Sequence, residues 1–90
     1  MQENGTSKVT VLYFAAARDI TGIASETFSV PHSLGDLTSI LTTKYGEELR
    51  KILDHSLYAV NMDYVEKDLE TNTVLKDRDE VAIIPPVSGG

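Results

Sequence analysis

A single apolar stripe at helical spacing runs through the middle of this 90-residue chain. Its members are Leu34, Leu37, Ile40, Leu41 and Tyr45. Ser33 precedes the stripe as a predicted N-cap that accepts a hydrogen bond from the backbone N–H of Asp36, and Gly46 follows as a predicted C-cap. The pattern predicts one amphipathic helix whose apolar side covers a sheet. A second, shorter helix is predicted over 47–53.

Strand-like segments lie on both sides of this helix. Residues 8–14 are rich in β-branched and aromatic residues and predict a central first strand, with 26–30 as its antiparallel partner after a short helical turn. Beyond the helix, 57–61 and the pair 64–65 predict short strands, and 80–84 predicts a buried last strand. This order predicts an α+β domain in which a helix packs across a mixed sheet.

Two turns are predicted between the later strands. Met62-Asp63 would reverse the chain after the third strand, and the acidic segment 77–80 would form a solvated turn or a charged patch for a partner. The histidines, His32 and His55, have no second ligand three or four residues away, so we predict no metal site.

Composition excludes several classes of function. The chain has no cysteine, which rules out a disulfide framework, a thiolate zinc site, a cysteine-held iron-sulfur cluster and a cysteine nucleophile. With 14 acidic and 8 basic residues the net charge is -6, so we expect no binding to nucleic acid or to membranes, and a partner with a basic surface. Residues 1–7 are polar and predict a disordered N-terminus without a secretory signal, so we expect a cytosolic, cytoplasmic protein.

The character of the sequence changes after the last strand. Pro85 and Pro86 remove two backbone donors and stiffen the chain, so 8–84 is predicted to be the domain and 85–90 a projecting tail. Extended, that tail reaches about 20 Å, enough to enter a partner's pocket. Gly89 and Gly90 carry no side chain, so the terminal carboxylate could pass a narrow channel. Because the sequence shows no nucleophile elbow and no phosphate loop, we expect no catalytic residues in the domain itself.

Three segments carry a family resemblance: 11–15 with Arg18 and Gly22 after it, 59–61, and above all 79–90 with its ending Pro-Pro-Val-Ser-Gly-Gly. Over nearly its whole length the chain resembles the small, sulfur-carrying subunits of molybdopterin synthase, which belong to the β-grasp sulfur carriers and ubiquitin-like proteins. The resemblance implies a ubiquitin-like β-grasp fold with a mixed sheet of about five strands. Arg78 departs from it, because a glycine is expected in that turn.

The resemblance also implies a chemistry. An E1-like adenylating enzyme would use ATP to convert the carboxylate of Gly90 into an acyl-adenylate, and a sulfur donor would then leave a thiocarboxylate there. This sulfur would pass to cyclic pyranopterin monophosphate to form the dithiolene of molybdopterin. The chain would bind no cofactor of its own. Its partners would be the E1-like enzyme and the large synthase subunit, which would hold the active site, in a heterotetramer of two small and two large subunits.

Each tail residue then has an expected role. Gly90 carries the sulfur, Gly89 gives clearance, and Ser88, Val87, Pro86 and Pro85 form the rest of the inserted segment. Ile84 is expected to dock against the partner, with burial in the core as the alternative. Three other functions stay open: a modifier joined to lysines through Gly90, a sulfur carrier for thiamine thiazole synthesis, and a β-grasp interaction module whose tail has no role.

Overall fold

A computed structural model describes residues 7–86; residues 1–6 and 87–90 are not described. Its elements in chain order are β1 (Lys8–Tyr13), α1 (Ala15–Thr21), β2 (Ser25–Ser29), α2 (Leu34–Tyr45), α3 (Glu47–Asp54), β3 (Leu57–Val60), β4 (Asp63–Val65), the 3-10 helix η2 (Lys67–Asn72) and β5 (Glu80–Ile84). The division into 1–7, 8–84 and 85–90 stays a prediction, because most of the first and last segments lies outside the described residues.

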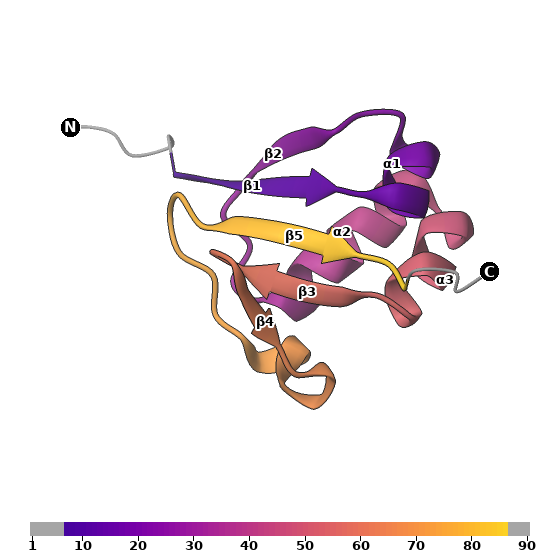
Figure 1. The fold of residues 1–90 in the computed structure, drawn as a ribbon. Coiled ribbons are helices and arrows are strands. Elements are labelled where there is room, and N and C mark those ends of the chain that lie inside the picture. The colour runs from indigo at the N-terminus through magenta and orange to yellow at the C-terminus, as the bar shows by residue number, and fades with distance from the viewer. Residues whose placement is uncertain (1–6, 87–90) are drawn as a thin grey trace.

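The strands form one five-stranded sheet in the order β2-β1-β5-β3-β4. β1 and β5 are parallel, whereas the other neighbouring pairs are antiparallel. All three α-helices lie on one face of this sheet (Figure 1). The predicted α+β architecture, with helices across a mixed sheet, is therefore confirmed. The first strand is an interior strand as predicted, because β1 pairs with β2 on one side and with β5 on the other, while β5 is the middle strand of the five.

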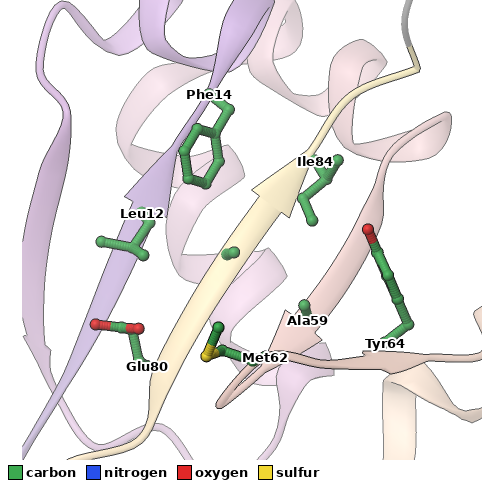
Figure 2. Close-up of a pocket in the computed structure, with 8 residues that line it drawn as sticks. Leu12, Phe14, Ala59, Met62, Tyr64, Glu80 and Ile84 are labelled. Atoms are coloured by element: carbon green, nitrogen blue, oxygen red, sulfur yellow. The ribbon is translucent and has the colours of Figure 1, made fainter.

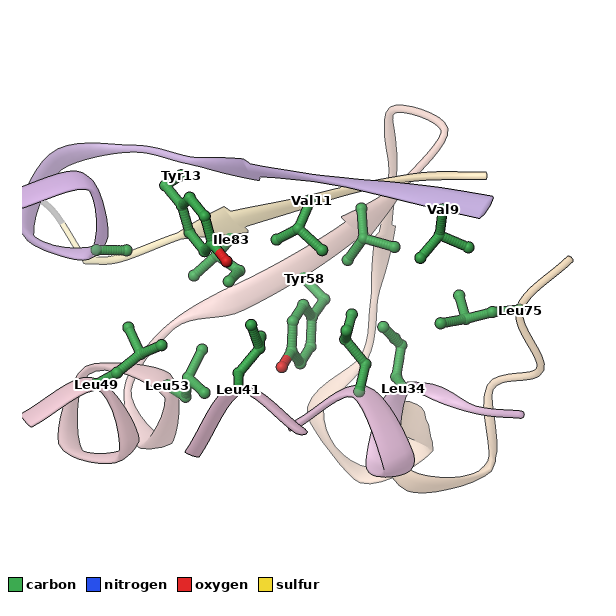
Figure 3. Packing of buried hydrophobic residues seen from close by; sticks show 13 residues of the cluster. Val9, Val11, Tyr13, Leu34, Leu41, Leu49, Leu53, Tyr58, Leu75 and Ile83 are labelled. Carbon is green, nitrogen blue, oxygen red and sulfur yellow. The ribbon is translucent and has the colours of Figure 1, made fainter. Parts of the chain in front are cut away.

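The core lies between the sheet and the helices (Figure 3). Val9, Val11 and Tyr13 alternate along β1 toward the helices, and Val81 and Ile83 do so along β5. From the helix layer, α2 and α3 contribute Leu34, Leu37, Leu41, Leu49 and Leu53. Ser33 accepts a hydrogen bond from the backbone N–H of Asp36, as the predicted N-cap requires.

Two local predictions were wrong, and one element was missed. Ile40 is 38% exposed, because the buried stripe of α2 is centred on Leu34, Leu37 and Leu41 and Ile40 lies at its edge. The turn after β3 is formed by Asn61 and Met62, both with positive φ, so Asp63 already belongs to β4. The 3-10 helix η2 was not predicted, since its residues show no helical apolar period and none of them is buried.

Asp79, which was predicted to lie in a solvated turn or in a charged patch for a partner, is buried. Its carboxylate accepts hydrogen bonds from Asn61 Nδ2 at 2.9 Å and from the backbone N–H of Lys76 at 2.8 Å. Asn61 Oδ1 in turn accepts from the backbone N–H of Glu80 at 2.9 Å. Asp79 is buried because these donors replace water around it, and the network fixes the position where β5 begins.

Arg78 adopts the left-handed backbone conformation, with φ of 72°. The family resemblance leads one to expect glycine at this position, and the turn keeps a glycine-like geometry although a side chain is present. We expect Arg78→Gly to stabilise the protein by about 0.5–1 kcal/mol, because the strain of a left-handed non-glycine residue exceeds the chain entropy that glycine loses on folding. Urea unfolding measures this. Lys76→Gly, made as a control in the same loop, should destabilise; equal loss of stability in both variants would contradict the assignment of strain to Arg78.

A polar cluster joins the edge strand β2 to α2. Glu26 Oε1 accepts hydrogen bonds from the hydroxyls of Tyr13 at 2.9 Å and Tyr45 at 2.7 Å, and Glu26 Oε2 pairs with Lys44. The Glu26 side chain is only 15% exposed. Burial raises the pKa of this carboxyl. The hydrogen bonds from Lys44, Tyr45 and Tyr13 together lower the pKa by more than burial raises it, so that it lies below its ordinary value of 4.5.

This cluster predicts a pH-dependent stability. A carboxyl whose pKa is lower in the folded state stabilises the fold above its unfolded pKa, and this contribution is lost as pH falls through the folded pKa. We expect Glu26→Gln to lower the free energy of unfolding by about 1–2 kcal/mol at pH 7, because the charge-assisted hydrogen bonds weaken. The difference from the unsubstituted chain should narrow as pH falls below the ordinary carboxyl pKa of 4.5 and Glu26 becomes protonated in the folded protein. Urea unfolding over this range tests it, and a constant difference would show that the carboxylate charge is unimportant.

Candidate docking groove and tail exit

The face of the sheet opposite the helices carries a groove, here called the outer-face groove. The register of the strands explains its floor. Ala82 on the middle strand β5 pairs with Leu12 of β1 on one side and with Ala59 of β3 on the other. Two adjacent alanines leave the floor low, while larger side chains stand on either side. The groove is lined by Leu12, Phe14, Ala59, Met62, Tyr64, Glu80, Ala82 and Ile84.

Several large apolar side chains of this groove are exposed (Figure 2). Phe14 is 48% exposed on the β1 side, and on the other side Met62 is 89% and Tyr64 67% exposed. No other segment among residues 7–86 covers them. Exposed apolar surface gathered in a hollow is typical of a protein–protein interface. The groove therefore has the composition of a docking surface.

The tail leaves the domain at one end of the groove. Ile84, the last residue of β5, is half-buried and lines the groove. The next residue, Pro85, is buried, and together with Phe14, Ala15 and Ile84 it lines a second apolar hollow at the base of the tail. Because proline has no N–H, the ladder cannot continue, and the chain departs from the sheet at this point. A partner bound in the groove would lie next to the start of the tail.

The structure places part of the predicted site. Ile84, Pro85 and Pro86 are described. The half-buried side chain of Ile84 lines the groove and does not belong to the core between the sheet and the helices. The remaining predicted site residues, Val87, Ser88, Gly89 and Gly90, lie outside the described residues. Their roles stay predictions.

The two histidines that were considered as metal ligands both lie at the surface. His32 is exposed, and His55 is the exposed C-cap of α3. Among residues 7–86, no group of three His, Cys, Asp or Glu side chains is arranged to hold a metal ion. In the same part of the chain, no helix combines the length and the apolar character needed to cross a bilayer.

Sequence reasoning missed most of the groove. Of its lining residues, Ile84 was predicted as a docking residue, and Glu80 was predicted within the acidic segment 77–80 as part of a solvated turn or a charged patch for a partner. Leu12 and Phe14 were not predicted, although they alternate with the buried valines along the first strand. The apolar residues on both faces of the first strand were interpreted as a sign of a buried, central strand. An uncovered sheet face and a covered one can both carry apolar residues at alternate positions. The alternation alone therefore did not reveal that one face of the first strand is exposed.

Solved structures with this fold define the class of protein. Small archaeal modifier protein 1 from Methanosarcina acetivorans superposes with a TM-score of 0.78 at 28% identity, covering 93% of this chain and 97% of that one. Subunit 1 in the complex of subunits 1 and 2 of the molybdopterin-converting factor from Helicobacter pylori gives a TM-score of 0.67 at 29% identity, covering 92% and 99%. The chain is thus a ubiquitin-like β-grasp protein.

Sequence comparison narrows the class. The molybdopterin synthase sulfur carrier subunit of Mycosarcoma maydis is 41% identical over 97% of this chain and 98% of that protein. The human protein of the same name is 42% identical over 92% of this chain and 94% of its own length. The model of the ThiS family matches residues 11–90, and the chain belongs to this family.

Proposed function

We propose that this chain is the sulfur carrier subunit of a molybdopterin synthase and that it holds sulfur as a thiocarboxylate on Gly90. The observation that carries the proposal is the family match, which extends over 11–90 and so includes the Gly89-Gly90 ending. Relatives that are called molybdopterin synthase sulfur carrier subunits cover this chain nearly end to end. The groove beside the exit of the tail supports it further, since a carrier must dock before its terminus can be used.

Activation is proposed to take place on an E1-like adenylating enzyme. An oxygen of the Gly90 carboxylate attacks the α-phosphorus of ATP, and pyrophosphate leaves. A hydrosulfide ion released by the sulfur donor then attacks the acyl carbon, and AMP leaves. The product is a thiocarboxylate at Gly90, so sulfur is carried without a cysteine, which this chain lacks. ATP is a substrate of the activating enzyme in this scheme and not a cofactor of the carrier.

Delivery is proposed to take place on the large synthase subunit. The outer-face groove docks against that subunit, and Pro85 and Pro86 direct the tail into its active site. The large subunit supplies the acid, the base and the pterin-binding groups, so the carrier acts as a co-substrate whose binding positions the reactive terminus. Two deliveries complete the dithiolene, which fits an assembly of two small and two large subunits. We place this reaction in the cytosol.

Two other functions share the terminal chemistry. The similarity to a structure called small archaeal modifier protein 1 favours conjugation of Gly90 to lysines of other proteins as the second candidate. A carrier for thiazole synthesis is the third. In both, the groove would serve a different partner.

Tracing labelled sulfur tests the proposal against both alternatives. The full chain is incubated with ATP, a labelled sulfur source and an E1-like enzyme, and then with a molybdopterin synthase large subunit and the pterin precursor. We expect the label in the dithiolene of the pterin product. Label that stays out of the pterin but enters a thiazole, or protein adducts linked through Gly90 without transferred sulfur, would contradict the proposed pathway in two distinguishable ways.

A further inference from the structure

Among the lining residues that belong to the described part of the chain, 7–86, Glu80 is the single charged one in the outer-face groove. It begins β5, and Ala82 and Ile84 follow it on the same face of the strand. In Figure 2, Glu80 lies beside Leu12 and Met62, at the end of the groove away from Phe14 and Ile84. The groove therefore has an apolar end at the tail exit and an acidic end opposite to it.

Both backbone polar groups of Glu80 form hydrogen bonds with Asn61. Its N–H donates to Asn61 Oδ1 at 2.9 Å, and its carbonyl accepts from the N–H of Asn61 at 2.8 Å. The carboxylate, in contrast, is exposed and forms no hydrogen bond or ion pair with any residue between 7 and 86. A charge on a well-fixed backbone, without a partner of its own, is available to another molecule.

The charge of Glu80 affects binding most strongly when a partner covers the groove. A protein that fills the groove removes water from the Glu80 carboxylate, and an ionised carboxylate without water or a counter-charge is strongly unfavourable. A basic side chain placed opposite restores the lost interactions. The net charge of -6 also favours approach of a basic surface.

We propose that the groove fits a partner protein whose docking surface is apolar at its centre and carries an arginine opposite Glu80. A planar guanidinium can pair with both carboxylate oxygens while it packs on the neighbouring Leu12 and Met62 side chains, which suits arginine better than lysine. The inference rests on the proposed function and adds the chemistry by which the large subunit recognises this carrier.

The pair also sets the direction of docking. Apolar contacts are non-directional, so the rest of the groove alone allows a partner to rotate or slide. Glu80 and Ile84 lie four residues apart on one strand, which places them roughly 13 Å from each other. An ion pair at the end away from the tail fixes the orientation in which the tail meets the partner's active site, and Glu80 is thus a positioning residue.

Binding of the full chain to the large subunit, measured at several salt concentrations, tests this inference. Glu80→Gln and the control Glu48→Gln change the net charge equally, but Glu48 is an exposed residue of α3 in the helix layer, behind the sheet (Figure 1). We expect Glu80→Gln to weaken binding by about tenfold or more and to flatten its salt dependence, and Glu48→Gln to stay within about twofold. Glu80→Asp, which keeps the charge, should recover part of the loss.

The outcomes separate the inference from the function on which it rests. Equal effects of Glu80→Gln and Glu48→Gln would show that only net charge matters and that Glu80 stays in water, which overturns the inference alone. Failure of the unsubstituted chain to bind the large subunit at all would overturn the proposed function, and the inference with it. A sulfur-transfer rate that falls in Glu80→Gln even at saturating large subunit supports the orienting role.

Discussion

Removal of Gly90 should reduce sulfur transfer to the pterin by at least about 100-fold, because a misplacement of the reacting atom by even 1 Å can cost that much. Without Gly90, the carboxylate of Gly89 becomes the terminus, and it falls short of the reaction centre by roughly 3.4 Å. Adding one residue after Gly90 moves the carboxylate too far by the same distance and adds a side chain where the proposed channel accepts none. Both variants should be equally inactive. Product formation in the reconstituted synthase measures the effect.

The loss should come from chemistry and not from folding. The described core is formed by residues between Val9 and Ile83, so neither variant changes it. Urea unfolding curves of both variants should therefore coincide with that of the unsubstituted chain. Their affinity for the large subunit should fall only modestly, since the groove is intact. Retained sulfur transfer in either variant would rule out the terminal carboxylate as the sulfur carrier.

Ile84→Glu should weaken binding to the large subunit by about 100-fold or more, which corresponds to about 2.7 kcal/mol. The substitution removes apolar contact area worth about 1.5–3 kcal/mol when fully buried, and it places a second carboxylate in the apolar end of the groove. Because Ile84 also lies at the base of the tail, transfer should fall along with binding. Isothermal titration with the full chain measures the affinity.

Ile40→Glu is the matched control. Ile40 is the same residue type, is 38% exposed, and lies on α2 behind the sheet, away from the groove. We expect its affinity for the large subunit to match that of the unsubstituted chain. Ile84→Ala, which adds no charge, should lose about tenfold through contact area alone. If Ile40→Glu weakened binding as much as Ile84→Glu, added negative charge and not the groove would explain the effect.

Local patterns were sufficient to predict most of the fold. Ser33 and Asp36 lie three residues apart, so the capping hydrogen bond could be inferred from the sequence alone. The β-branched and aromatic residues of 8–14 likewise predicted the first strand, which the structure has as Lys8–Tyr13. These features depend on neighbours along the chain, and their physical causes lie in backbone geometry and side-chain spacing.

The groove and the network around Asp79 depend on pairings between distant segments. Ala82 and Ala59 form a low floor only because β5 lies next to β3, and nothing in either segment alone specifies that neighbour. Asp79 was predicted to be solvated because it is charged, and its burial depends on Asn61, which lies 18 residues away. Strand order, and not local propensity, decided both features.

The most direct measurement is the mass of the C-terminal peptide after the full chain has been incubated with ATP, a sulfur source and an active E1-like enzyme. We expect one oxygen of the terminal carboxylate of Gly90 to be replaced by sulfur, the change to require ATP, and the sulfur to disappear from the peptide after transfer to the pterin. An unmodified Gly90, in a reaction where the same enzyme thiocarboxylates another carrier, would show that Gly90 does not carry the sulfur.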